Sequence, residues 1–214
     1  MSDNTIKIML VEDHAVVRAG LRRLFDDADS IEVIAEAESG EQACTLYPEH
    51  HPDVVVMDLS MPGIGGMQAI RRILAKDEDA KILVLSVHDD TIFPMRAVQA
   101  GARGYLTKGS DPKELINAVK QVADNQMFFE AGMAQQMAAQ KSTGKKDPID
   151  SLSAREFEIF CLLAEGRSVI EIAESLCLSP KTVGTHQTRI LRKLELTNAA
   201  QLAHLAIRHG VLKT

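Results

Sequence analysis

Short apolar runs alternate with amphipathic stretches through the first half of the chain. Each apolar run has the length and β-branched content of a buried strand, and each intervening stretch repeats its apolar positions at helical spacing. The predicted strands lie near 6–11, 31–36, 53–58, 81–86 and 103–107, and the predicted helices near 14–28, 40–50, 65–77, 90–100 and 111–124. Five strand–helix units in series predict a parallel sheet with right-handed crossovers, which makes this half an α/β domain.

The pattern from residue 151 onward is helical throughout, and capping residues mark where helices begin. In the first half, Asp111 and Glu114 form a predicted capping pair, and Pro112 opens the helix. In the second half, the predicted capping pairs are Ser153 with Glu156 and Ser168 with Glu171. A helix of about 168–176 is followed, after a short turn, by a helix of about 180–194 that Ser179 caps and Pro180 opens. A last helix of about 198–209 ends at Gly210, which suits a left-handed C-cap. The four helices predict an all-α domain that contains a helix-turn-helix.

Between the two patterned halves, residues 125–150 change character. Residues 131–141 are rich in Ala, Met and Gln and can form a short helix, whereas the polar stretch 142–150 is typical of a flexible tether. We therefore expect a first domain at 1–125, a partly helical linker at 126–150 and a second domain at 151–214.

Polar side chains stand where four of the predicted strands end. Glu12 and Asp13 follow the first strand, Asp58 ends the third, Ser86 ends the fourth and Lys108 follows the fifth. Because the carboxyl ends of parallel strands share one edge of a sheet, we expect these groups to converge. Carboxylates packed together repel one another, and a divalent cation such as Mg²⁺ relieves that repulsion. Alone, Asp58 would more simply be a helix cap or a turn residue, but the group as a whole indicates an aspartate that accepts a phosphoryl group.

In residue types, order and spacing, residues 1–125 resemble the receiver domain of two-component response regulators. The resemblance is carried by Glu12, Asp13, Asp58, the Met-Pro-Gly turn at 61–63, Ser86, Tyr105 and Lys108. It implies a flavodoxin-like fold with a five-stranded parallel sheet, phosphorylated on Asp58 by a sensor histidine kinase with Mg²⁺ as the cofactor.

The same resemblance implies a role for each residue of the site. The implied metal ligands are Asp13 and Asp58 directly, Glu12 through water and Ser60 through its main-chain carbonyl. Ser86 and Lys108 would bind oxygens of the phosphoryl group, and Tyr105 would turn inward behind Ser86. Gly109 stands where many receivers have proline, so the backbone geometry just past Lys108 is not carried over.

The predicted helix 180–194 has two different faces. The apolar face, with Val183, Ile190 and Leu194, is suited to packing on the rest of its domain. The opposite face has no carboxylate and carries Lys181, Gly184, Thr185, Thr188, Arg189 and Arg192. The solvated face of an ordinary helical bundle is the alternative interpretation. Hydroxyls mixed with cations nevertheless suit a helix that contacts the bases and phosphates of DNA.

The second half resembles the helix-turn-helix of LuxR-type regulators. The matching segments are 152–166, 171–183, His186 and 192–194, and with the receiver they make nearly the whole chain resemble the NarL/FixJ family. Within that family, segments such as 60–66, 98–109 and 202–210 are most similar to the GacA-type global regulators. The residues that we assign to promoter DNA are Lys181, Thr182, Thr185, His186, Thr188, Arg189 and Arg192.

Departures from the family pattern limit what can be carried over. No DNA contact is transferred to Val169, Ile170, Gly184 or Ala199, which stand where the family commonly has other residues. The family resemblance also implies that the unphosphorylated receiver covers the recognition helix, and that phosphorylation releases it to form a homodimer. We expect the homodimer to form through the last helix, around Leu202, Leu205 and Ala206, unless these residues belong to the core of their own domain.

Charge and composition narrow the class of protein. The 214 residues have a net charge of −6, divided into −8 over residues 1–124 and +2 over the rest. An acidic half and a weakly basic half suggest different partners for the two domains. The three cysteines, Cys44, Cys161 and Cys177, are far apart and are expected to be small buried hydrophobes. No apolar run reaches membrane-spanning length and the start is polar, so we expect a cytoplasmic protein.

Two rival functions compete with that of a transcription factor. A phosphohydrolase of the haloacid-dehalogenase type would use an aspartyl phosphate, but it needs a second Asp where this chain has Ser60, so we do not expect an enzyme. A signalling protein whose second domain binds a protein partner is the other rival, because the basic balance of that domain is weak.

Overall fold

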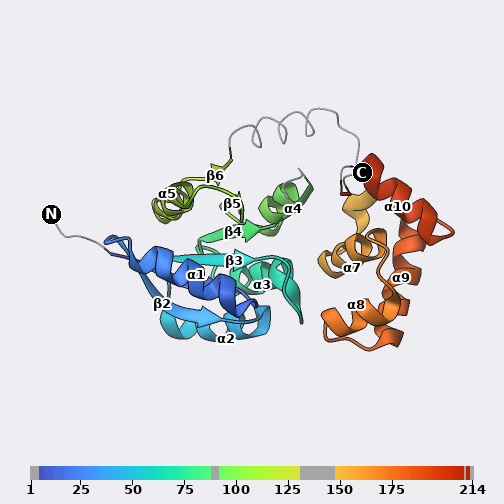
Figure 1. The fold of residues 1–214 in the computed structure, drawn as a ribbon, viewed down its shortest axis with the longest axis horizontal. Helices are drawn as coiled ribbons and strands as arrows, with labels where there is room; N and C mark the ends of the chain where they lie inside the picture. The colour runs from blue at the N-terminus through green and yellow to red at the C-terminus, as the bar shows by residue number, and fades with distance from the viewer. Residues whose placement is uncertain (1–4, 88–91, 131–147, 210, 213–214) are drawn as a thin grey trace. The chain divides into compact units, whose positions relative to one another are not determined.

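The chain folds into two compact units (Figure 1). The structure, a computed structural model, describes residues 5–87, 92–130, 148–209 and 211–212. The first unit is an α/β domain, and the described part of the second is a group of helices that begins at residue 148. The predicted helix at 131–141 and the predicted C-cap at Gly210 lie outside the described residues. No helix in the described ranges has both the length and the apolar character needed to cross a membrane.

The first unit contains a parallel sheet in the order β2-β1-β3-β4-β5-β6. Its strands are β1 (Ile6–Val11), β2 (Ile31–Ala37), β3 (Val54–Asp58), β4 (Ile82–Ser86), β5 (Gly104–Thr107) and β6 (Phe128–Phe129). The bounds of β1 to β5 match the prediction to within one residue, because β-branched runs favour strands that are covered on both faces. The predicted parallel α/β fold is therefore confirmed.

The short strand β6 was not predicted, and it makes the sheet six-stranded within the described residues. Phe128 pairs with Gly104 and Phe129 with Tyr105, both on β5. Two residues are too few to produce a periodic pattern, and they lie in the stretch that we assigned to the linker. Phe128 is buried in the core cluster, and this packing holds the stretch against the sheet.

Helices lie between the strands in sequence and cover the sheet (Figure 1). They are α1 (Ala15–Asp26), α2 (Gly40–His50), α3 (Gly65–Leu74), α4 (Ile92–Ala100) and α5 (Pro112–Ala123). One core cluster joins Val54 and Val56 of β3 to Phe25 of α1 and Val119 of α5. Val55, which alternates with these strand residues, is also fully buried, so the other face of the sheet is covered as well.

The start of α5 differs in detail from the prediction. Asp111 caps the helix and Pro112 opens it, as expected. The Asp111 carboxylate, however, accepts its hydrogen bond from the Lys113 N–H at 2.8 Å, one residue earlier than the Glu114 N–H that a capping box would use.

From residue 148 on, the described part of the second unit contains a short 3₁₀ helix followed by the four predicted helices. These elements are η1 (Pro148–Ser151), α7 (Ala154–Ala164), α8 (Val169–Ser175), α9 (Pro180–Lys193) and α10 (Ala199–Arg208). Both capping boxes, Ser153 with Glu156 and Ser168 with Glu171, are confirmed, and the Ser179 side chain caps α9. Helix α9 packs on α7 and α8, and α10 packs on α7.

The turn between α8 and α9 contains a cysteine in a strained backbone position. Cys177 has a φ of 51°, in the left-handed region that side chains other than glycine rarely adopt, and it is exposed. The expectation that all three cysteines are buried is therefore wrong for Cys177. Cys161 is buried and Cys44 is partly buried.

Candidate functional site

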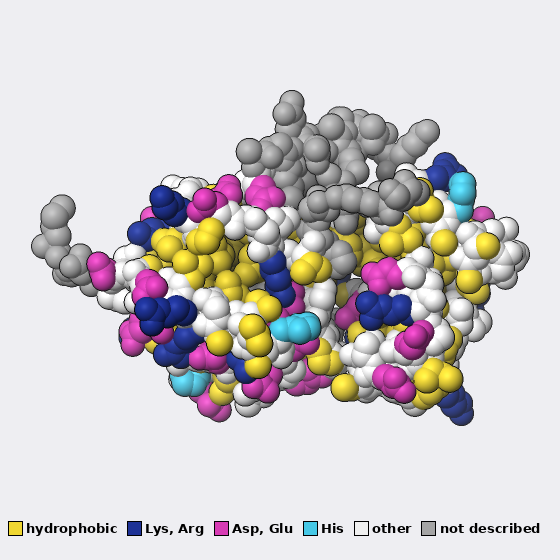
Figure 2. Space-filling view, viewed as in Figure 1, with side chains coloured by type: hydrophobic (Ala, Val, Ile, Leu, Met, Phe, Trp, Pro, Cys, Tyr) yellow, Lys and Arg dark blue, Asp and Glu magenta, His cyan; other side chains and the backbone are white. Residues whose placement is uncertain are grey.

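The strand order places two acidic residues next to each other at one edge of the sheet. Strands β1 and β3 are neighbours at the point where the order changes direction, which is where ligands bind in open α/β sheets. Val11 pairs with Met57 across these strands, so Glu12 and Asp58 follow at the same level. Both are buried, with 1% and 2% of their surface exposed. By contrast, on the face of this unit drawn in Figure 2, surface charges of both signs are interspersed.

Lys108 connects the two buried carboxylates. Its Nζ lies 2.6 Å from Oε2 of Glu12 and 3.0 Å from Oδ2 of Asp58. Both oxygens are buried, so the ammonium compensates two carboxylates that have little contact with solvent. Lys108 reaches this position because its N–H donates to the Ser86 carbonyl oxygen at 2.7 Å, which continues the pairing of β4 with β5.

The burial of this group changes the proton affinities of its members. Burial raises the pKa of the Asp58 carboxyl. The charge of Lys108 lowers this pKa in part, whereas the charge of Glu12 raises it further. Burial alone would lower the pKa of Lys108, but the carboxylates of Asp58 and Glu12 hold it above its usual value. The site thus concentrates negative charge that one lysine neutralises only in part.

The donor atoms at this edge suit a hard divalent cation. The carboxylates of Glu12 and Asp13 and the imidazole of His14 each place an atom within 4.8 Å of the others. Carboxylate oxygens are the ligands that Mg²⁺ prefers, and Glu12 and Asp58 place two buried carboxylates against one ammonium, so the residues present fit the predicted metal. His14 was not among the predicted ligands. Its side chain is 68% exposed, and its Nδ1 lies 3.0 Å from an Asp13 oxygen.

The other predicted residues of the site lie close by in sequence and sheet position. The Ser60 N–H donates to Oδ1 of Asp58 at 3.3 Å, which places Ser60 beside the carboxylate with which it was predicted to bind the metal. Ser86 ends β4 next to the strand of Asp58, and Tyr105 lies on β5. Both side chains are fully buried, so Tyr105 already points inward in this structure.

The loop after Asp58 is shaped by glycines. Gly66 has no space for a side chain, because a Cβ there would lie 2.0 Å from the Asp58 carbonyl oxygen. Its N–H donates to the Leu59 carbonyl oxygen at 3.1 Å, which holds the start of α3 against the end of β3. The contact explains why the chain requires glycine at this position beside the acidic site.

A second residue that the sequence did not reveal is Glu130, just past β6. Its Oε1 accepts hydrogen bonds from the Thr107 N–H at 3.1 Å and from the Thr107 hydroxyl at 2.9 Å, and Ser110 also donates to it. Thr107 immediately precedes Lys108. Glu130 therefore fixes the backbone from which the lysine extends. Because Thr107 and Glu130 are 23 residues apart, no local sequence pattern indicated this contact.

In the second unit, α9 presents the residues that we assigned to DNA. Val183, Ile190 and Leu194 are buried against the domain, as predicted. The exposed residues of the helix include Lys181, Thr182, Thr185, Thr188, Arg189 and Arg192. The hydroxyls of Thr185 and Thr188 donate to helix carbonyls one turn earlier, at 2.9 Å each, and both residues are exposed.

His186 and Lys193, also on α9, contact other parts of their own domain. His186 is half-buried, its Nδ1 is buried without a hydrogen-bond partner in the described structure, and burial lowers the pKa of the ring. Lys193 donates to Glu156 at 2.6 Å and to the Ser151 carbonyl oxygen at 3.1 Å. Lys193 thus ties the end of α9 to the start of α7, and a packing role fits His186 as well as a DNA contact does.

The residues predicted for the homodimer need a correction. Leu202 and Ala206 are fully buried, and α10 packs on α7, so these two side chains belong to the core of their own domain. The same helical spacing of apolar residues is found on a surface that binds a partner and on a face that packs inside a bundle, so the sequence pattern could not distinguish the two. Leu205 is partly exposed and lines an open groove with His204 and Arg208, so of the three residues only Leu205 remains available to a partner.

A parallel α/β domain with an acidic site at its switch point, followed by a helix-turn-helix domain, defines a two-domain signalling regulator. Residues 8–120 match the response regulator receiver domain family, and residues 150–206 match the LuxR family of bacterial regulatory proteins. The chain therefore belongs to the LuxR-type response regulators, which act as transcription factors.

Several relatives match almost the full chain. The response regulator UvrY of Escherichia coli K12 is 44% identical over 208 residues, 96% of this chain and 95% of the relative. The response regulator GacA of Pseudomonas aeruginosa is 42% identical over 209 residues, 97% of this chain and 98% of the relative. Among solved structures, the response regulator ChrA of a heme-sensing two-component system is 34% identical, with a TM-score of 0.53, and covers 98% of this chain and all of its own.

Proposed function

We propose that Asp58 accepts a phosphoryl group from a sensor histidine kinase, and that this modification controls the binding of α9 to promoter DNA. The observation that carries the proposal is the position of Lys108, 2.6 Å from buried Glu12 and 3.0 Å from buried Asp58. An ammonium placed between two buried carboxylates is suited to bind the oxygens of a phosphoryl group that arrives on one of them. We infer that the protein works in the cytoplasm, where kinase output and promoter DNA meet.

In the reaction, an oxygen of Asp58 forms a new O–P bond while the P–N bond to the phosphohistidine of the kinase breaks. The electron pair of the broken bond leaves with the donor imidazole, which takes up a proton. Mg²⁺, when bound, would neutralise charge on the transferring oxygens. Glu12, Asp13, Asp58 and the Ser60 carbonyl are the residues that would hold it. Lys108 would transfer its ion pair from the Asp58 carboxylate to a phosphoryl oxygen, without leaving Glu12.

The added group changes the balance between two states of the protein. A phosphoryl group brings nearly two negative charges and three strong acceptors into a site that already repels negative charge. Ser86, buried at the end of β4, and Tyr105, buried on β5, are the residues that would respond to it. We propose that this response biases the chain toward the state in which α9 is free to bind DNA.

Promoter binding is assigned to the exposed face of α9. Thr185, Thr188 and Arg192 would face base edges, and Lys181 and Arg189 would contact phosphates. A homodimer of the phosphorylated chain would place two copies of α9 about one turn of DNA apart. The alternative that the second unit binds a protein partner instead predicts no retardation of promoter fragments in a gel shift. Turnover of an external phosphate ester is not expected, because Ser60 stands where a phosphohydrolase needs its acid.

The acceptor assignment is tested by mass spectrometry of the full chain after incubation with acetyl phosphate. The wild-type chain should gain one phosphoryl group in the presence of Mg²⁺ and none after removal of divalent cations with a chelator. Asp58→Asn should gain none, whereas the exposed control Asp79→Asn should label like the wild type. Labelling that persists in Asp58→Asn would refute the assignment.

A further inference from the structure

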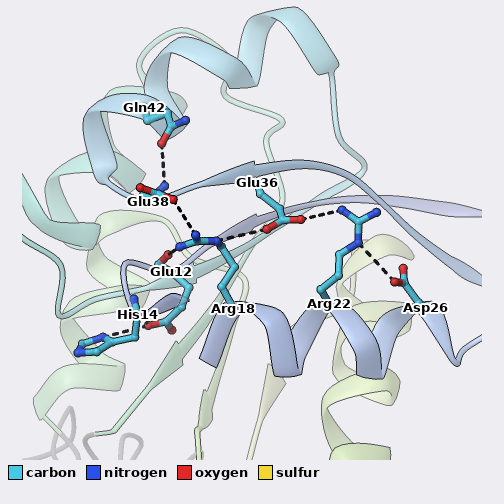
Figure 3. A network of polar contacts seen from close by, with 8 residues as sticks. All are labelled: Glu12, His14, Arg18, Arg22, Asp26, Glu36, Glu38 and Gln42. Carbon is cyan, nitrogen blue, oxygen red and sulfur yellow. Dashed lines mark hydrogen bonds and ion pairs between the residues drawn. The ribbon is translucent and has the colours of Figure 1, made fainter. Parts of the chain in front are cut away.

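Arg18, on the first helix, contacts the main chain of the acidic site. Its Nη1 donates to the carbonyl oxygen of Glu12 at 2.7 Å (Figure 3). The N–H of the same Glu12 donates to the Ala37 carbonyl oxygen at 3.0 Å. The peptide groups on both sides of Glu12 are therefore fixed, one by strand β2 and the other by the Arg18 side chain.

The guanidinium of Arg18 is itself held in place by two further carboxylates. Its Nη2 donates to Glu38 at 2.7 Å, and its Nε lies 3.3 Å from Glu36. Only 13% of the Arg18 side chain is exposed. The planar fork of an arginine can engage several acceptors at once, which a lysine ammonium on a flexible stem does less well.

The neighbouring Arg22 shares part of this network but not its contact with the site. Arg22 lies one helical turn further along α1 and donates to Glu36 at 2.7 Å and to Asp26 at 3.4 Å (Figure 3). Among the described residues, Arg22 makes hydrogen bonds and ion pairs with Glu36 and Asp26 and none with Glu12. A comparison of substitutions at the two arginines therefore distinguishes the loss of the ion pairs between α1 and the β2 region from the loss of the contact with Glu12.

The loop that Arg18 holds is the one from which the acidic side chains extend. The carboxylate of Glu12 turns back to accept the His14 N–H at 3.2 Å, and Asp13 lies between these two residues. A carboxylate that is 1% exposed cannot reorient freely, so the position of its main chain decides where its oxygens lie. Partners behind a metal ligand commonly change metal affinity 10- to 100-fold when they are removed.

We infer that Arg18 is a positioning residue for the divalent cation of the acidic site, acting through the main-chain carbonyl of Glu12. The inference rests on the proposed function, because it assumes that Mg²⁺ binds beside Asp58. Arg18 touches neither the cation nor the phosphoryl group. Its role is to hold the loop of residues 12–14 in the geometry that Mg²⁺ requires.

The test compares Arg18→Met with the matched control Arg22→Met in the full chain. Two quantities are measured: the Mg²⁺ concentration that gives half-maximal labelling by acetyl phosphate, and the Mg²⁺ dissociation constant from calorimetry without any phosphodonor. Arg18→Met should raise both by about tenfold or more, while the labelling rate at saturating Mg²⁺ stays within about threefold of the wild type. Arg22→Met should keep both quantities close to the wild-type values.

Two results would overturn the inference. One is a wild-type Mg²⁺ dissociation constant in folded Arg18→Met, and the other is an equal rise in Arg22→Met, which would indicate a general loss of packing. If Arg18→Met does not fold, Glu38→Gln replaces it, since it loosens the guanidinium without touching Glu12. It should then weaken Mg²⁺ binding, and an unchanged constant would contradict the inference. Failure of the wild-type chain to label with Mg²⁺ would instead contradict the proposed function itself.

Discussion

The acidic site of the receiver and the exposed face of α9 use charge in opposite ways. At the strand ends, Glu12 and Asp58 are almost entirely buried and share one ammonium. On α9, Lys181 and Arg192 are exposed. Buried charges must be placed before a ligand arrives, because the interior cannot rearrange cheaply. Exposed charges on a helix can take up their positions when DNA binds, so their arrangement in the free protein says less about their function.

The largest expected effect comes from the packing beneath the acidic site. Gly66→Ala should destabilise the receiver by about 3 kcal/mol or more, because the new Cβ would lie 2.0 Å from the Asp58 carbonyl oxygen and 2.7 Å from the Leu59 Cα. Labelling of Asp58 by acetyl phosphate should be lost with it. The control is Gly109→Ala, whose Cβ would meet no atom within 4 Å. Equal stability of the two variants in chemical denaturation would show that the site does not depend on this close approach.

A second comparison lies within α9 itself, between two of its lysines. Lys193→Ala removes the partner of Glu156, whose side chain is only 6% exposed, and should destabilise the helical domain by about 1–2 kcal/mol. Hydrogen exchange over residues 154–208 measures this change. Lys181→Ala should leave exchange unchanged, weaken promoter binding and reduce its salt dependence by about one unit of slope. An equal rise in exchange in Lys181→Ala and Lys193→Ala would contradict the view that only Lys193 stabilises the domain, through its ion pair with buried Glu156.

A smaller effect is expected at Gly184, in the middle of α9. A Cβ at this position would meet no atom within 4 Å, so Gly184→Ala should stabilise the helix by about 1 kcal/mol through backbone propensity alone. Slower hydrogen exchange in α9 would show the gain. A parallel loss of promoter affinity would indicate that DNA approaches the helix at this glycine, whereas unchanged affinity would place Gly184 away from the interface.

The smallest effect concerns pH. Burial alone would raise the pKa of Glu156, but hydrogen bonds from Lys193 and Ser153 outweigh it and hold the pKa below its usual value. A carboxyl whose pKa is lower when folded contributes stability above its unfolded pKa of about 4.5, and this contribution is lost as the pH falls through the folded value. Glu156→Gln should therefore flatten the loss of helical-domain stability below about pH 4.5. An unchanged slope would show that Glu156 is not the group that responds.

The fold and most of the acidic site could be predicted because they depend on local pattern and strand ends. Runs such as Val54–Val56 indicate covered strands, and parallel order then brings Glu12, Asp58 and Lys108 to one edge. Contacts between residues far apart in sequence gave no such signal, as with Glu130 on Thr107. A helical apolar pattern also could not tell that Leu202 is core rather than a dimer surface.

The residues with a left-handed backbone conformation show another limit of prediction from the sequence pattern. Cys177 and Glu195 adopt positive φ values of 51° and 56° where glycine or asparagine would have marked the turn. In each case the preceding helix ends and the chain turns at this residue. The turns could be predicted from the sequence, but the residues that adopt these angles could not.

On the proposed function, a phosphoryl group on Asp58 increases the affinity of the helix-turn-helix domain for promoter DNA. The fragment to use is a promoter recovered by genome-wide mapping of bound DNA. Its fluorescence anisotropy is measured while it is titrated with the full chain, before and after the chain is treated with acetyl phosphate and Mg²⁺. We expect the dissociation constant to fall on phosphorylation of the wild type and to stay unchanged in Asp58→Asn. An equal fall in Asp58→Asn, or no fall in a wild-type sample shown to be phosphorylated, would contradict the account.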